Sequence, residues 1–236
     1  MYRKRFIYIR ESGIIIVMKQ FFILGASTVY GVGAESDGWG DLVKSYIHSK
    51  MYGTEGIGER YEVFNFSKSG STIEFVAETA DLIFDKYARE GEIVTLISVG
   101  GNDAKAENTP DNFVCAPEDF QVKVTRLFES LQQHSQQIIF ISNGFVDESK
   151  VNPKKSPFND NKVSYFTNER RALFNSITKQ VCDDKGIDFV TVDIDKDIWI
   201  KNYLYTDGLH PNQVGYQKVF EAIKPIIDKS LSNDQP

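Results

Sequence analysis

Asp207 and His210 stand three residues apart near the end of the chain, and Pro211 follows them directly. A carboxylate at this spacing can hold an imidazole in one tautomer and stabilise its charged form, as a general base requires. The other two histidines, His48 and His134, fall in a helical and a polar segment and are expected at the surface. A structural Asp–His pair that caps the last helix is the alternative interpretation.

Ser27 follows a short apolar strand, in the segment Gly25-Ala26-Ser27-Thr28. A serine at a strand-to-helix turn presents its hydroxyl at the carboxyl edge of the sheet, with backbone N–H groups nearby. Both a nucleophile and an oxyanion hole can use that geometry. The alternative is that Ser27 only caps the segment that follows it.

Two further turns follow predicted strands, and each offers a hydrogen-bond donor. The N–H of Gly70 can donate to an oxyanion, while a turn glycine with Ser71 or Thr72 capping the next helix is the alternative. Asn102, in the segment Gly100–Asp103, offers a neutral amide that suits a developing oxyanion. Asn and Asp also form ordinary turns, so this segment alone does not decide between the two.

These residues need a scaffold that brings them together, and the hydrophobic pattern predicts one. Short apolar runs indicate buried strands, and apolar residues spaced by three and four indicate helices between them. The alternation predicts an α/β fold with a five-stranded parallel sheet that is covered on both faces. Its carboxyl edge, where such sheets carry their sites, would hold all four candidate loops. We expect the strands at 21–24, 61–66, 93–99, 138–141 and 189–192, and the helices at 73–87, 120–131, 166–181 and 214–227.

With these blocks in this order, the chain resembles the SGNH hydrolase superfamily, the GDSL-type esterases and lipases, from about residue 19 to residue 227. The specific blocks are Gly-x-Asn-Asp, ending at Asp103, and Asp-x-x-His-Pro, starting at Asp207. The resemblance implies a three-layer α/β/α flavodoxin-like fold, ester hydrolysis, no cofactor and no metal.

The resemblance also implies a role for each matching residue. Ser27 would be the nucleophile, His210 its base, and Asp207 the residue that orients His210. The backbone N–H groups of Ser27 and Gly70 and the side chain of Asn102 would form the oxyanion hole.

Ala26 departs from the family pattern, which usually has an aspartate directly before the serine. That aspartate is not a catalytic group, so activity is expected to survive. Gly38-Trp39 is similar to the family's Gly-Trp after the nucleophile loop, although a core aromatic explains Trp39 as well. Tyr30 and Trp39 can shape a substrate pocket, or can equally be surface and core.

The composition is that of a globular chain and excludes several classes of protein. With 236 residues, 41% hydrophobic and 25% charged, the chain is neither disordered nor collagen-like. Its net charge of −6 makes it a poor candidate for nucleic-acid binding, which depends on neutralising phosphates. Two distant cysteines, Cys115 and Cys182, exclude a disulfide framework or a cysteine-rich zinc site and favour a reducing compartment.

Residues 1–18 are expected to be an N-terminal extension, with Met18 as an alternative start, and residues 19–236 a single hydrolase domain. The basic residues 1–10 and apolar residues 14–18 look like a signal peptide, but the apolar run is too short to span a membrane. We therefore expect a cytoplasmic protein. The stretch 143–162, with two prolines and several lysines, is expected to be a polar loop.

The sequence thus predicts a metal-independent serine esterase that acts through an acyl-enzyme. Its expected substrates are short acyl or acetyl esters of small or carbohydrate alcohols. Three alternatives stay open: a lysophospholipase-like lipid acylhydrolase, an enzyme that transfers the acyl group to an acceptor other than water, and a non-catalytic binding module on the same fold. The expected partner is a small-molecule acyl ester substrate, with no nucleic acid and no membrane span.

Overall fold

The computed structural model describes residues 18–53, 61–156, 159 and 161–232, and the backbone of 8–9 and 15–16. Most of the predicted N-terminal extension lies outside the described residues. Its two described pairs, β1 (Tyr8–Ile9) and β2 (Ile15–Ile16), are antiparallel partners. The boundary between extension and domain stays a prediction.

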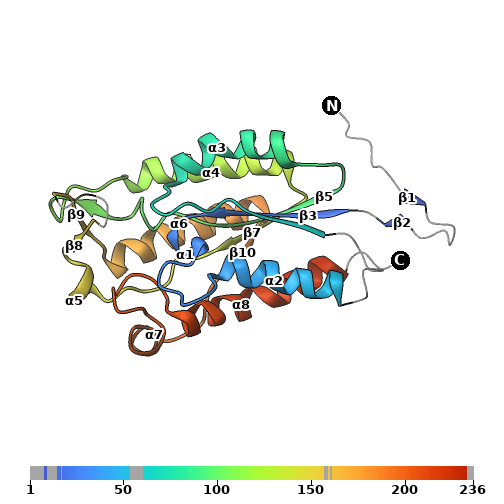
Figure 1. Cartoon of the computed structure of the whole chain (residues 1–236). Coiled ribbons are helices and arrows are strands. Elements are labelled where there is room, and N and C mark those ends of the chain that lie inside the picture. Colours follow the sequence, from blue (N-terminus) through green and yellow to red (C-terminus); the bar gives the residue numbers. More distant parts are fainter. Residues whose placement is uncertain are drawn as a thin grey trace.

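Five parallel strands form the central sheet in the order β10–β7–β5–β3–β4 (Figure 1). β3 (Lys19–Gly25) pairs with β5 (Glu92–Ser98) on one side and with β4 (Tyr61–Asn65) on the other. Beyond β5 lie β7 (Gln137–Ile141) and then β10 (Asp188–Val190). Every one of these strands overlaps a predicted one, and the predicted fold class is confirmed.

Helices cover both faces of the sheet. One face packs against α3 (Ile73–Tyr87), α4 (Pro117–His134) and α6 (Asn168–Lys185). The other packs against α2 (Trp39–Tyr52) and α8 (Gln213–Ser232).

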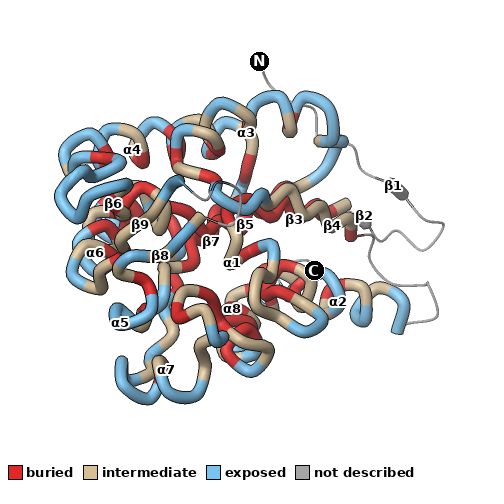
Figure 2. The backbone as a smooth tube through the Cα atoms, turned by 60° about the vertical axis from the view of Figure 1, so that its left-hand side comes forward, coloured by how far each residue is buried: buried red, intermediate tan, exposed pale blue. Residues whose placement is uncertain are grey.

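β3 lies between these two layers and contributes side chains to both. Phe22 and Leu24 belong to the core beside α3 and α4, while Phe21 and Ile23 belong to the core beside α2 and α8. Figure 2 shows the buried positions gathered along the strands and the inner sides of the helices.

The stretch 143–162 is not the plain polar loop that its composition predicted. It contains α5 (Glu148–Val151) and β8 (Lys154–Lys155). β8 pairs with β9 (Val163–Tyr165), which also pairs with β6 (Ala106–Glu107) in a small antiparallel sheet.

A third, small core explains why this stretch is ordered. Val146, Val151 and Phe166 are buried against one another. Phe166 was expected on the apolar stripe of the next helix, but Thr167 caps α6 by accepting a hydrogen bond from the Arg170 N–H. The helix therefore begins after Phe166 and leaves that ring to the small core.

Four side chains lie elsewhere than predicted. Tyr87, Leu173 and Val214 are 48%, 42% and 55% exposed although all three were expected on the apolar stripes of the predicted helices. His134 is not a plain surface residue, because its ring stacks on Phe84 with centroids 4.6 Å apart and its Nε2 lies 3.0 Å from Asp81 Oδ1. None of the helices in the described part of the chain is long and apolar enough to cross a membrane.

Candidate active site

Ser27 begins the short helix α1 (Ser27–Tyr30) just beyond the carboxyl end of β3. Gly25, the last residue of β3, has a φ of 148°, and a Cβ there would lie 2.3 Å from Ser98 O and 2.5 Å from Val29 Cγ2. Only glycine fits this close approach of backbone to backbone. The Ala26 N–H donates to the same Ser98 O at 3.2 Å, so the end of β5 holds the turn that presents Ser27.

The structure brings Ser27, His210 and Asp207 together. His210 Nε2 lies 2.9 Å from Ser27 Oγ, and His210 Nδ1 lies 2.6 Å from Asp207 Oδ2. An ionised carboxylate can only accept, so Nδ1 carries the proton and donates to Asp207. Nε2 is then the free acceptor that faces the serine hydroxyl, which is the tautomer that a general base needs.

Asp207 is held as an anion by a converging set of donors. Its Oδ1 accepts the backbone N–H groups of Leu209 and His210 at 2.9 and 3.0 Å. Burial by itself raises the pKa of Asp207, but the hydrogen bonds from the His210 ring and from these two amides outweigh it and hold the pKa well below its usual range. Lys154 adds a cation, with its Nζ 3.4 Å from Asp207 Oδ2.

The loop that carries Asp207 and His210 is fixed at both ends. The Tyr205 N–H donates to His210 O, and the Asn212 N–H donates to Tyr203 O, each at 2.8 Å. The Asp147 N–H donates to Gly208 O at 2.8 Å, which ties the loop to the ordered stretch between β7 and α6. Backbone hydrogen bonds therefore fix the position of the loop that carries the His–Asp pair.

Asn102 lies with Ser27 and His210 in a small cleft at the carboxyl edge of the sheet. Its Nδ2 donates to Ser71 O at 2.9 Å and has a second N–H to offer. Beside it, the buried carboxylate of Asp103 accepts the Ile73 N–H at 3.2 and 3.1 Å.

These bonds join the Asn102 turn to the start of α3. Burial raises the pKa of Asp103 to about 6, against the lowering effect of the Ile73 amide. The turn before α3 carries Gly70, which is exposed, has a φ of 84° and is not among the residues that line the cleft.

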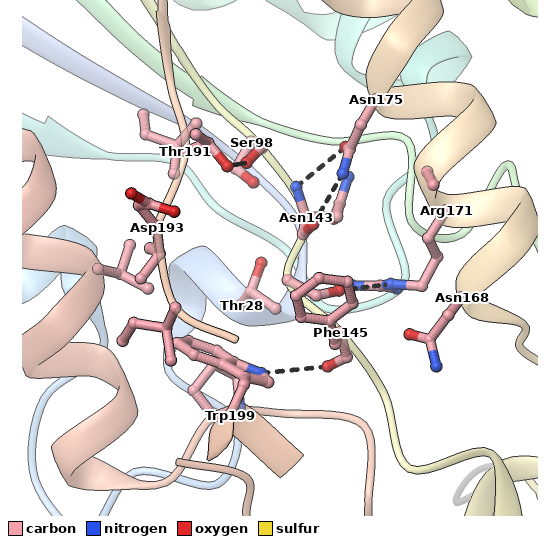
Figure 3. Close-up of a pocket in the computed structure, with 18 of the residues that line it drawn as sticks. Thr28, Ser98, Asn143, Phe145, Asn168, Arg171, Asn175, Thr191, Asp193 and Trp199 are labelled. Carbon is pink, nitrogen blue, oxygen red and sulfur yellow. Dashed lines mark hydrogen bonds between the residues drawn. The ribbon is translucent and has the colours of Figure 1, made fainter. Parts of the chain in front are cut away.

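A larger cavity of about 470 Å³ opens beside the cleft, over the ends of β7 and β10 (Figure 3). Apolar and polar side chains share its wall. Trp199 donates its indole N–H to Phe145 O at 3.2 Å. The side chain of Asn175 makes two hydrogen bonds to the backbone of Asn143: its Oδ1 accepts the Asn143 N–H, and its Nδ2 donates to Asn143 O. The residues that line both the cavity and the cleft are Thr28, Asn143, Arg171 and Leu209.

The profile of one protein family, GDSL-like Lipase/Acylhydrolase, matches residues 21–223, which is most of the chain. The chain belongs to this family. The stretch matched by the family runs from the strand before Ser27 to the helix after His210.

Known proteins are similar to this chain in sequence or in fold. The chain is 24% identical to the GDSL esterase/lipase CPRD49 of Arabidopsis thaliana over 215 residues, 88% of this chain and 78% of the relative. The crystal structure of the lipase/acylhydrolase from Enterococcus faecalis has a TM-score of 0.63 at 18% identity, covering 90% of this chain and 96% of that one. The acetylxylan esterase Axe2 of Geobacillus stearothermophilus has a TM-score of 0.60 at 15% identity, covering 88% and 93%.

Membership of the GDSL family makes this protein a carboxylic ester hydrolase. At Ala26, where the family usually has an aspartate, the serine turn is intact: Ala26 is 7% exposed and is one of the residues that line the cleft. Of the two aromatics considered for a pocket, Trp39 is buried and lines the larger cavity, whereas Tyr30 is 61% exposed.

Sequence reasoning missed several residues around the site, chiefly Arg171, Asn143 and Lys154. Arg171 had a detectable signal, because it shares the buried side of α6 with Phe174 and Thr178, where a charge is out of place. Asn143 and Lys154 had none, since each stood in a stretch that its composition marked as a loop.

Proposed function

We propose that the protein is a metal-independent serine esterase that hydrolyses short acyl esters of small or carbohydrate alcohols through an acyl-enzyme. The observation that carries the proposal is the continuous chain of hydrogen bonds from Asp207 Oδ2 through the His210 ring to Ser27 Oγ.

In the first half-reaction Ser27 Oγ attacks the acyl carbonyl carbon while His210 Nε2 takes the hydroxyl proton. The second N–H of Asn102 and the backbone N–H of Ser27 stabilise the resulting oxyanion. Gly70, the third donor expected from the sequence, does not line the cleft and is not given a role in this step. The oxyanion collapses, the C–O bond to the alcohol breaks, and His210 gives its proton to the leaving oxygen. The acyl group is then bonded to Ser27.

In the second half-reaction a water molecule replaces the alcohol. His210 takes one proton from the water as its oxygen attacks the acyl carbon, and returns it to Ser27 Oγ as the carboxylic acid leaves. Asp207 stabilises the imidazolium in both halves through its 2.6 Å contact to Nδ1.

The cavity supports a small substrate. Its volume of about 470 Å³ is in the lower half of the range for small-molecule sites, and it lies next to the cleft that holds Ser27. The acetylxylan esterase among the structural relatives adds a precedent for acetyl esters of carbohydrates on this fold.

The test is turnover of a para-nitrophenyl ester series from acetyl to decanoyl by the wild type and by Ser27→Ala and His210→Ala. We expect turnover that decreases with acyl length and is lost in both variants, with no loss after chelator treatment. A maximum at long acyl chains would favour the lipid acylhydrolase instead. Full activity in Ser27→Ala would contradict the mechanism, and products esterified to an added alcohol would indicate acyl transfer.

A further inference from the structure

Arg171 is a buried cation beside the candidate active site. It lies one turn into α6 and is 6% exposed, on the same side of the helix as Phe174 and Thr178. Charged side chains are almost never this buried unless another charge pairs with them.

The guanidinium of Arg171 has little to compensate its charge. Its Nε donates to Gly144 O at 2.8 Å. Among the described residues, no carboxylate pairs with it and no acceptor is bonded to Nη1 or Nη2. The neighbouring Arg170 differs, because its guanidinium donates hydrogen bonds to two backbone carbonyls, Ala104 O and Cys115 O.

An uncompensated buried charge destabilises a protein, because the cost of removing it from water is not returned by a partner. Burial lowers the pKa of Arg171 to about 10, so the side chain is still a cation at neutral pH. The free enzyme therefore carries an uncompensated charge on Arg171. A bound anion would offset the free-energy cost of removing that charge from water.

The free end of Arg171 faces the site rather than the core. Arg171 lines both the cleft that holds Ser27 and the larger cavity, and Figure 3 shows it reaching from α6 towards that cavity. A Cβ at Gly101 would lie 3.0 Å from Arg171 Nη1, so the missing side chain at Gly101 leaves room beside the guanidinium. The other cation on the cavity wall, Lys179, is already paired with Asp183 at 2.7 Å.

We propose that Arg171 binds a carboxylate of the substrate, so that the preferred substrates are esters carrying a carboxylate near the scissile bond. This rests on the proposed function. The two free Nη groups form the fork that a carboxylate matches with two parallel hydrogen bonds. The anion belongs at the Ser27 end of the cavity, because the carboxylate of Asp193 stands across from Arg171 (Figure 3).

The carboxylate can belong to the acyl group or to the alcohol, and two matched substrate pairs distinguish these sources. The acyl pair is the mono-para-nitrophenyl ester of glutarate and the same ester of glutaramate. The alcohol pair is para-acetoxybenzoate and para-acetoxybenzamide. In each pair only a carboxylate is exchanged for an amide of nearly the same size, and enzyme-free hydrolysis is subtracted.

We expect the wild type to favour the carboxylate member of one pair by about 10- to 100-fold in kcat/KM, the effect of charge-assisted hydrogen bonds to one ligand group. Arg171→Gln is expected to abolish that preference, because its kcat/KM falls much more for the carboxylate member of the pair than for the amide member. Arg171→Lys is expected to retain part of it, because the charge stays and the fork is lost. Arg126→Gln, which removes a positive charge from the exposed side of α4, is the control and is expected to keep the wild-type preference.

Thermal melting checks that each variant is folded. The preference of the wild type for the carboxylate member of a pair is measured on the wild type alone, so it does not depend on the folding of any variant. Equal rates within both pairs for the wild type would overturn the proposal. So would an Arg171→Gln variant that loses the same factor on carboxylate and neutral esters, because Arg171 would then serve the reacting carbonyl. Loss of all turnover in Ser27→Ala is a separate result that concerns only the proposed function.

Discussion

Asp103 offers a quantitative test of how the Asn102 turn is held. Its carboxylate is 2% exposed and accepts the Ile73 N–H at the start of α3, and burial raises its pKa to about 6. The substitution Asp103→Asn keeps an oxygen that can accept from Ile73 but removes the buried charge. The variant therefore isolates the energetic cost of ionising this side chain inside the protein.

The sign of the pH dependence follows from the raised pKa. The folded protein holds the proton on Asp103 more tightly than the unfolded chain does, whose pKa is near the ordinary 3.8. The contribution of this group to stability is therefore fully present below about pH 4 and is lost as the pH rises through about 6. The difference between the two pKa values corresponds to about 3 kcal/mol in total, of which about 1 kcal/mol is lost between pH 5 and pH 7.

Urea unfolding at pH 5, 6 and 7, followed by the fluorescence of the buried Trp39 and Trp199, measures this effect. The free energy of unfolding of the wild type, relative to that of Asp103→Asn, should fall by about 1 kcal/mol from pH 5 to pH 7. The difference between the two proteins cancels the pH-dependent contributions of groups that both contain. One of them is Asp207, whose lowered pKa makes the folded protein more stable, not less, as the pH rises.

Asp85→Asn on the exposed side of α3 is the matched control. Its free energy of unfolding should change with pH in the same way as that of the wild type. If the free energy of unfolding of Asp103→Asn changed with pH in the same way as that of the wild type, burial would not be raising the pKa of the Asp103 carboxyl, and the reasoning would be refuted.

Three further predictions concern the site itself. Asn102→Ala should lower kcat for short esters by about 10²- to 10³-fold with little change in KM, the usual effect of removing one oxyanion donor; an unchanged kcat would exclude Asn102 from that role. Asp207→Asn should lower kcat by about 10⁴-fold, because the amide no longer fixes the tautomer of His210, while circular dichroism shows the fold unchanged; near-normal turnover would argue against the proposed relay. Gly25→Ala should lower the melting temperature markedly, since its Cβ would lie 2.3 Å from Ser98 O; an undisturbed melting curve would mean that the backbone can move apart there.

The sequence was most informative about the strands and the residues that end them. Buried parallel strands are short apolar runs, and Ser27, Asn102 and His210 lie in three separate turns or loops that meet at one edge of the sheet. The order of the blocks was enough to indicate that these side chains meet. The structure adds that Ser27 and His210 are in direct contact.

Other parts of the molecule could not be predicted from local pattern. The ordered stretch around α5 depends on Val146 and Val151 meeting Phe166, and nothing in the spacing of these residues shows that contact in advance. The contact between Lys154 and Asp207 depends on the same packing. Helical periodicity placed Leu173 inside, but the buried side of α6 is rotated towards Arg171, which a hydrophobic pattern cannot include.

The proposed nucleophile, Ser27, and its proposed base, His210, lie 183 residues apart, one after the first strand of the central sheet and the other before the last helix. Ribosomes add roughly 5 to 20 residues each second, so Ser27 is made some 10 to 40 seconds before His210. Throughout that interval the nascent chain has a serine without a base and cannot hydrolyse esters by this mechanism. Catalytic competence therefore arrives only after His210 has been made and its ring has met Ser27, and ester turnover during translation would report that moment.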